Sequence, residues 1–111
     1  ARIGRLMGEA GVNIEAIQGL VIERKGLVQF VVDKPDLAEQ ALKDEGFAYR
    51  TRDVLLVDVM NEPGTLGDVA LVMSEAGITV DAVYISMNGR LVMSVDDLDG
   101  AIQVAHGMAV L

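Results

Sequence analysis

The residues of this chain that could do chemistry gather in one short segment, Asn61–Thr65. Pro63 fixes its own φ, and Gly64 permits a positive φ and a close approach of other atoms to the backbone. If a helix begins near Thr65, its first three N–H groups have no partner within the helix and favour a carboxylate. The amide of Asn61 beside them is both donor and acceptor. These groups could bind the two ends of a free amino acid; the alternative is a strand-to-helix turn without a ligand.

The other polar residues offer little to catalysis or to metal binding. His106 is the only histidine, so no second one is available for a nucleophilic triad, and the chain has no cysteine. The pairs Asp33 with Asp36 and Asp96 with Asp97 stand at predicted helix starts, where capping is the better interpretation. We therefore predict that the chain is not an enzyme and that it needs no metal and no cofactor.

Composition narrows the classes of partner. The 111 residues are 51% hydrophobic and carry a formal net charge of −8, with no basic run. This charge argues against nucleic acid and against an anionic membrane surface, both of which require clustered Lys and Arg. No apolar run approaches the roughly 20 residues of a membrane span. Because the chain opens on Ala1-Arg2 without the apolar core of a signal peptide, we expect a cytoplasmic protein.

Apolar periodicity and turn residues predict the elements that position the Asn61 segment. The Asn88-Gly89 pair is a strong hairpin signal, and glycines at 11, 46, 77 and 107 end the predicted helices. The predicted helices cover residues 3–10, 35–45, 66–76 and 96–106. The predicted strands cover residues 14–23, 27–32, 47–51, 54–60, 80–87, 90–95 and 108–111, with a polar turn at 24–26.

The two halves of the chain repeat each other. Met7–Gly11 aligns with Met73–Gly77, and Asp33 aligns with Asp96. A complete unit has the order β-α-β-β-α-β, which is the ferredoxin-like arrangement of the α+β class. We assign residues 1–52 to the first unit and 53–111 to the second. Because the first unit begins at its helix, we expect residues before Ala1 to carry its first strand and turn.

The second half, VLLVDVMNEPGTLGDVALVMSEAGITVDAVYIS, resembles an ACT domain, and RIGRLMGEAGVNIEAI with FVVDKPDLAEQALKDEGF resembles a second copy without its front. The resemblance covers nearly the whole chain and is greatest to small tandem ACT proteins without a catalytic domain. It implies βαββαβ units with two helices on one face of a four-stranded antiparallel sheet. Such units pair side by side into an eight-stranded sheet, and small effectors, often amino acids, bind at the junction.

The resemblance also implies the residues of the site. In family members that bind amino acids through this loop, an Asn before Pro-Gly acts together with an Asn at the head of the second strand of the neighbouring unit. Asn61 matches the first position and Asn13 the second. Thr79 occupies the second position in the other repeat, where its shorter side chain puts a second site in doubt. The predicted ligand-binding set is Asn61, Glu62, Pro63, Gly64, Thr65, Leu66, Asn13, Ile14 and Thr79.

Two functions from different classes remain open at this stage. The first is a non-catalytic regulatory module that senses a free amino acid and acts within a homo-oligomer, most simply a dimer. The second is a structural or interaction domain that assembles without a ligand. An acylphosphatase-like enzyme on the same fold is disfavoured because the loop around Asn61 contains no arginine for phosphate.

Overall fold

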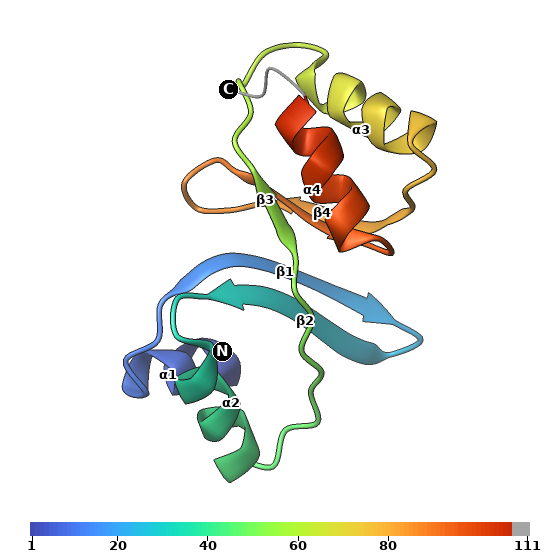
Figure 1. The fold of residues 1–111 in the computed structure, drawn as a ribbon. Coiled ribbons are helices and arrows are strands. Elements are labelled where there is room, and N and C mark those ends of the chain that lie inside the picture. Colours follow the sequence, from blue (N-terminus) through green and yellow to red (C-terminus); the bar gives the residue numbers. More distant parts are fainter. Residues whose placement is uncertain (108–111) are drawn as a thin grey trace. The chain divides into compact units, whose positions relative to one another are not determined.

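A computed structural model describes residues 1–107 of the chain. The chain divides into two compact units, Ala1–Thr51 and Arg52–Leu111. Each unit has a hydrophobic core of its own. The secondary structure comprises four helices and two antiparallel sheets, as expected for an α+β protein (Figure 1).

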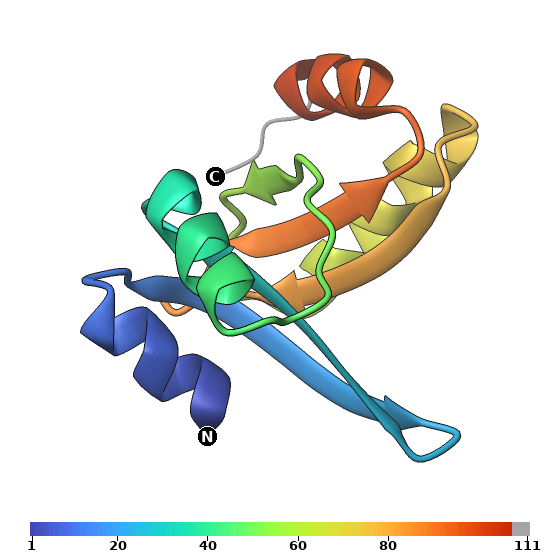
Figure 2. The same cartoon turned by 90° about the horizontal axis from the view of Figure 1, so that it is seen from below.

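The first unit contains the elements α1 (Arg2–Glu9), β1 (Ile14–Ile22), β2 (Lys25–Val32) and α2 (Pro35–Asp44). The two strands form an antiparallel hairpin, and both helices lie on one face of it (Figure 1). The far end of the hairpin extends beyond the helices (Figure 2). The buried core side chains come from both helices and from the segment that follows α1; they are Met7, Val12, Ala38 and Leu42.

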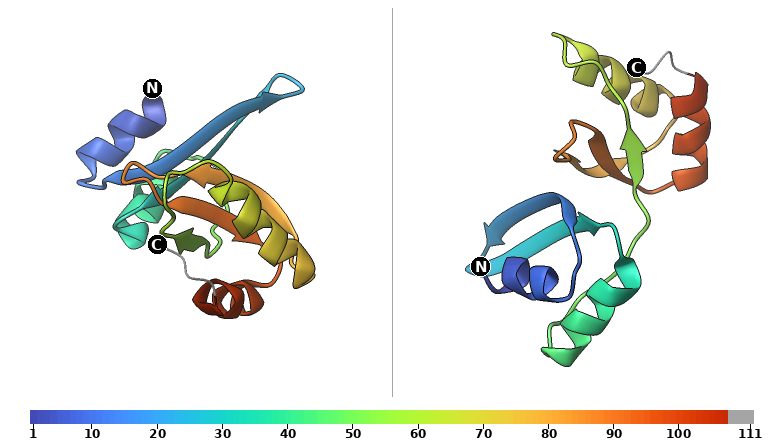
Figure 3. Two further views of the ribbon diagram at one scale, coloured as in Figure 1. Left: turned by 90° about the horizontal axis from the view of Figure 1, so that it is seen from above. Right: turned by 90° about the vertical axis from the view of Figure 1, so that its left-hand side faces the viewer.

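The second unit contains β3 (Leu55–Val57), α3 (Thr65–Glu75), β4 (Val80–Ile85), β5 (Leu91–Val95) and α4 (Leu98–Gly107). Its sheet has the antiparallel order β3-β5-β4, in which the third strand of the unit lies between the first and the second. This is the order of the first three strands of a ferredoxin-like unit. Both helices cover the same face of the sheet (Figure 3), and the core includes Val69 and Met73 from α3 and Met93 from β5.

Helices α1 and α3 end in the same way, which confirms the predicted left-handed residues. Gly11 has a φ of 73° and Gly77 a φ of 74°. In each case the next residue donates its N–H to the carbonyl of a buried methionine five residues earlier, Val12 to Met7 O at 2.9 Å and Ile78 to Met73 O at 3.0 Å. This is the Schellman pattern, which satisfies end carbonyls and places the following apolar residue in the core.

The turn of the first hairpin differs from the prediction. A polar turn at residues 24–26 was expected, but Ile22 pairs with Lys25, so the turn consists of Glu23 and Arg24 alone. Both of these residues have a positive φ, 50° and 69°. Two-residue turns of this kind match the right-handed twist of the flanking strands, which is why the ladder continues through Lys25 and Gly26.

Three predicted strands also change. Residues 47–51 do not form a strand, because β2 pairs with β1 only and no first strand is present among the described residues of this unit to support a fourth. Strand β3 is shorter than the predicted 54–60, because its partner β5 begins at Leu91, opposite Val57. Strand β4 ends at Ile85 rather than at residue 87. The predicted strand at 108–111 lies outside the described residues.

Candidate functional site

The segment between β3 and α3 forms the turn that its sequence predicts. The carbonyl of Glu62 accepts a hydrogen bond from the N–H of Thr65 at 3.3 Å. Gly64, the third residue of this turn, has φ 89° and ψ −13°. With Pro63 in the second position, these values define a type II turn, which requires a positive φ at its third residue. The turn therefore delivers the chain directly into α3.

The start of α3 has two free backbone donors. The N–H of Asp68 donates to Gly64 O at 3.0 Å, and the N–H of Thr65 is used by the turn. Among residues 1–107, no hydrogen-bond acceptor is present for the N–H of Leu66 or Gly67, and no side chain caps the helix. The sequence predicted three free groups; the closed turn leaves two. Two adjacent N–H groups at a helix N-terminus can accept an anionic oxygen.

The surface around these donors is open. Asn61, Glu62 and Leu66 are exposed, and 53% of Leu66 is accessible. A Cβ placed on Gly64 or Gly67 would meet no atom within 4 Å. A small molecule could therefore approach the backbone of this helix start closely.

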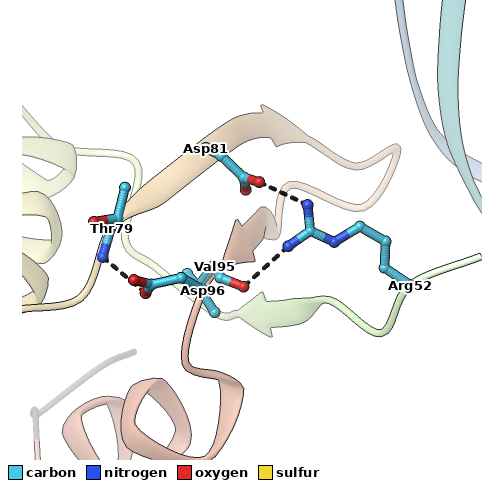
Figure 4. A network of polar contacts seen from close by, with 5 residues as sticks. All are labelled: Arg52, Thr79, Asp81, Val95 and Asp96. Atoms are coloured by element: carbon cyan, nitrogen blue, oxygen red, sulfur yellow. Dashed lines mark hydrogen bonds and ion pairs between the residues drawn. The ribbon is translucent and has the colours of Figure 1, made fainter.

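The heads of the second strands, at Asn13 and Thr79, are built alike in the two units. The N–H of Asn13 donates to Asp33 Oδ1 at 2.9 Å, and the N–H of Asp33 donates back to Asn13 O at 3.2 Å. In the second unit, Thr79 N–H donates to Asp96 Oδ1 at 3.0 Å, and Asp96 N–H donates to Thr79 O at 3.1 Å (Figure 4). A register shift follows immediately in each first strand of the pair.

These contacts correct the predicted role of two aspartates. Asp33 and Asp96 were expected to cap helices, but each carboxylate closes the strand pair at its head instead. The side chain that meets the helix start in the second unit is that of Asp97, whose Oδ1 accepts the N–H of Gly100 at 3.0 Å. The sequence pattern places Asp at the right turn, but it does not distinguish a helix cap from a strand latch. By strand latch we mean the two hydrogen bonds by which Asp33 or Asp96 closes the head of its strand pair.

The predicted site residues thus fall into two groups. Asn61 to Leu66 form one continuous loop and helix start in the second unit, where Thr79 also lies. Asn13 and Ile14 belong to the first unit. Because the latch uses the N–H of Asn13, only its exposed side chain is available to a ligand. Ile14 is half-buried against the core of its unit, which gives it a structural role. A composite site of Asn61 with Asn13 stays a prediction.

An ion pair near Thr79 was not predicted. Arg52, just before β3, donates from Nη1 to Asp81 Oδ2 at 2.6 Å and from Nη2 to Val95 O at 3.0 Å (Figure 4). The Arg52 guanidinium lowers the pKa of the exposed Asp81 carboxyl below its usual value. This contact spans the three strands of the sheet at one end. Its partners are too far apart in sequence for any local pattern to reveal it.

The loop before α3 offers groups that suit binding. No cluster of three or more His, Cys, Asp or Glu that could bind a metal occurs among residues 1–107. In the same part of the chain, no helix is long and apolar enough to cross a membrane. The loop instead offers backbone N–H groups, an amide and an open surface, which suit a small polar molecule.

A ferredoxin-like α+β repeat with an Asn-Glu-Pro-Gly loop at a helix start defines a class of small-molecule-binding regulatory domains. A family model described as an ACT domain pair matches residues 1–106, and the chain belongs to this family. ACT domains are generally regulatory, non-catalytic modules that bind small ligands.

The chain is also similar to a solved structure, the crystal structure of protein BT0572 from Bacteroides thetaiotaomicron. The two are 26% identical, and the match has a TM-score of 0.88. It covers 98% of this chain and 78% of that chain. A search of curated proteins found no match.

Proposed function

We propose that this protein is a non-catalytic module that senses a free amino acid in the cytoplasm through a site between its two ACT units. The observation that carries the proposal is the start of α3, where the N–H groups of Leu66 and Gly67 have no partner among residues 1–107. They lie on an open surface, and Asn61, in the segment that leads into this helix, is also exposed. A carboxylate on the two N–H groups and an ammonium near the amide oxygen would satisfy all three.

The second half of the proposed site is the side chain of Asn13. The two hydrogen bonds to Asp33 fix the backbone of Asn13 at the head of β1, so the exposed amide of Asn13 extends from a fixed position. Thr79, at the same place in the other unit, offers a hydroxyl in place of an amide. We therefore expect one amino-acid site per chain, formed by Asn61 and Asn13.

A thermal-shift screen against the twenty amino acids tests this function. An amino acid present at a hundred times its Kd should add about 2.7 kcal/mol of stability. Because about 1 kcal/mol raises the Tm of a small domain by roughly 4–8 °C, the shift should be easily measured. Asn61→Ala and Asn13→Ala should each abolish it. Gln103→Ala, which removes an exposed amide from α4, is the matched control and should leave the shift unchanged.

Two outcomes would count against the proposal. If none of the twenty amino acids changes the Tm of the wild-type chain, the sensing function is wrong. If one does, but both Asn61→Ala and Asn13→Ala keep the full shift, the binding site lies elsewhere on the molecule.

Assembly without a ligand is the second candidate function, and a different observation favours it. Strand β4 is paired on one side only within the described sheet, and apolar side chains follow each other along it. Val83 and Ile85 on β4 are 42% and 66% exposed, and Met87, in the turn after the strand, is 84% exposed. An exposed apolar row on an edge strand suits a second copy of the chain.

A further inference from the structure

Helix α2 begins at a residue that is poorly suited to a helix start. Lys34 occupies the N-cap position, and no side chain caps this helix. N-cap positions favour Ser, Thr, Asp and Asn, whose oxygen accepts a backbone N–H. In addition, the positive end of the helix dipole repels a cation at this place. Lys34 therefore works against the element that it starts.

The fold itself does not require a lysine at this point. In the second unit the corresponding residue is Asp97, which directly follows the latch residue Asp96 as Lys34 follows Asp33. Asp97 Oδ1 accepts the N–H of Gly100 and so caps α4. The same turn thus has a well-suited residue in one unit and an ill-suited one in the other. A residue that breaks a local rule marks a position at which a function should be sought.

The ammonium of Lys34 lies at the Asn13 half of the proposed site. Lys34 Nζ donates to Gly11 O at 3.2 Å, two residues before Asn13. Asp33, the neighbouring carboxylate, has its Oδ1 engaged by the N–H of Asn13. No carboxylate among residues 1–107 lies within 4.0 Å of Lys34 in an ion pair. The exposed ammonium therefore keeps N–H groups for another acceptor at the end of the first unit that carries Asn13.

The contact with Gly11 accounts for the charge only in part. The carbonyl of Gly11 lies just after α1, where a lysine side chain can satisfy an end carbonyl and where the negative end of the helix dipole favours a cation. A neutral donor such as the amide of glutamine would also provide a hydrogen bond. Helix α3 ends in the same way although the second unit has Asp97 in place of this lysine, so the fold does not depend on the charge.

We propose that Lys34 is a specificity-determining residue of the amino-acid site and that its ammonium binds a carboxylate of the effector next to Asn13. This inference rests on the proposed function. A charge-assisted hydrogen bond from Lys34 is stronger than the neutral one that Asn13 alone could make. At the corresponding place in the second unit, Asp97 stands where Lys34 would be, and the nearby Arg52 is already engaged by Asp81 and by Val95 O, so a carboxylate is disfavoured there. The difference between Lys34 and Asp97 thus favours a carboxylate near Asn13 in the first unit and disfavours one near Thr79 in the second.

The test uses three variants of the full chain, with Tm measured in the absence of ligand and Kd measured by calorimetry for the amino acid that binds the wild type. Lys34→Asp introduces the residue of the second unit; it should raise the ligand-free Tm and weaken binding at least tenfold, which is 1.4 kcal/mol. Lys34→Gln keeps a donor for Gly11 and should weaken binding by a similar factor. Lys43→Gln, which removes an exposed charge from the last turn of α2, should leave Kd unchanged and lower the ligand-free Tm slightly, because a cation is favourable at this end of the helix.

A comparison of ligands shows whether Lys34 meets the side-chain carboxylate or the α-carboxylate of the amino acid. If Lys34 meets a side-chain carboxylate, the wild type should bind glutamate or aspartate at least tenfold more tightly than glutamine or asparagine. If it meets the α-carboxylate, an amino acid whose α-carboxylate has been converted to an amide should bind at least tenfold more weakly. In Lys34→Gln, whichever preference exists should disappear.

Wild-type affinity within twofold in both Lys34→Asp and Lys34→Gln would overturn the inference while leaving the sensing function intact. Absence of binding of any amino acid to the wild-type chain would instead overturn the proposed function and this inference with it. A folded Lys34→Asp protein with a raised Tm and unchanged Kd would show that the lysine has no part in the site.

Discussion

Gly67 lies in the first turn of α3, three residues after the Gly64 of the Pro-Gly turn, and one of the two free N–H groups belongs to it. A Cβ at this position would meet no atom of the protein within 4 Å, and the glycine has no unusual φ. In a helix, glycine is less favourable than alanine by roughly 1 kcal/mol. The protein alone would therefore gain from a larger residue here.

Ligand binding, by contrast, requires a residue without a side chain at position 67. The Cα–Cβ bond of a helical residue tilts toward the helix N-terminus. A methyl group on Gly67 would consequently point toward the space in which a bound carboxylate meets the N–H groups of Leu66 and Gly67. We predict that Gly67→Ala raises the free energy of unfolding of the ligand-free protein by about 0.5–1 kcal/mol and weakens amino-acid binding at least tenfold. Thermal unfolding and calorimetry measure the two effects.

Gly8 provides the control for this variant. It also lies within a helix, α1, and an added Cβ would likewise meet no atom within 4 Å. Gly8→Ala should stabilise the protein by a similar amount without any change in Kd. If Gly67→Ala bound the amino acid as well as Gly8→Ala does, the start of α3 would not be the binding surface.

At the scale of elements, the first hairpin stores strain in its turn. Glu23 and Arg24 both adopt a positive φ, a conformation that costs ordinary residues about 1–2 kcal/mol each. Asparagine followed by glycine is the preferred pair for such a turn. We predict that the double variant Glu23→Asn with Arg24→Gly stabilises the first unit by about 1–2 kcal/mol. Hydrogen exchange of the β1 and β2 amides would report the gain within this unit.

A single substitution tests whether the turn is correctly placed. Lys25→Asn puts an asparagine before Gly26, so it would favour a turn two residues further along the chain. In the observed register both residues belong to the ladder, Lys25 opposite Ile22 and Gly26 opposite Val21. This variant should therefore not stabilise the hairpin. Stabilisation by Lys25→Asn equal to that by the double variant would place the turn at the position that the sequence alone suggested.

Local signals in the sequence were sufficient for most of these elements. Apolar periodicity and the glycines at 11 and 77 predicted α1 and α3 with their ends, and Asn88-Gly89 predicted the second hairpin. Apart from the turn of the first hairpin, where Glu23 and Arg24 adopt a positive φ that their residue types do not favour, the strand predictions that were wrong depend on partners distant in sequence. Residues 47–51 have strand-like composition but lack a neighbouring strand among the described residues, and composition cannot show this.

The same difference between local signals and distant partners applies to the candidate site. The loop at Asn61 and its type II turn were predicted, because Pro63 and Gly64 determine the backbone locally. By contrast, Asp33 was taken for a cap because its contact with Asn13 joins residues twenty positions apart. Lys34 escaped notice for the same reason, since its relation to Gly11 exists only in the folded unit. The presence of a strand before Ala1 remains a prediction.

At the scale of the whole molecule, the negative charge is unevenly shared. Residues 52–111 contain two arginines and no lysine, against nine aspartates and glutamates. Both arginines are already paired, Arg52 with Asp81 and Arg90 with Asp58. The second unit should therefore repel nucleic acid and other polyanions. Contact between two copies of the second unit must then rest on apolar side chains rather than on charge attraction.

Strand β4 offers the surface for such contact. Edge strands usually carry charged residues that prevent pairing with other chains. The only charged residue of β4 is Asp81, which is bound by Arg52, while Val83 and Ile85 are exposed. We predict that the wild-type chain is a dimer at 0.15 M salt, with a mass by light scattering of twice 11.8 kDa. Ile85→Lys should yield the monomer, because it buries a charge at the contact.

Leu71→Lys is the matched control, since Leu71 is also apolar and 56% exposed but lies on α3. It should remain a dimer. A wild-type mass of 11.8 kDa, or a dimer that survives Ile85→Lys, would rule out this strand as the contact. The amino-acid shift in Tm, measured on the Ile85→Lys monomer, then separates the two functions: a retained shift means that sensing needs only one chain, because Asn61 and Asn13 both belong to it. Loss of the shift would mean that the site is assembled between copies, with Asn61 of one chain facing the Asn13 corner of the other.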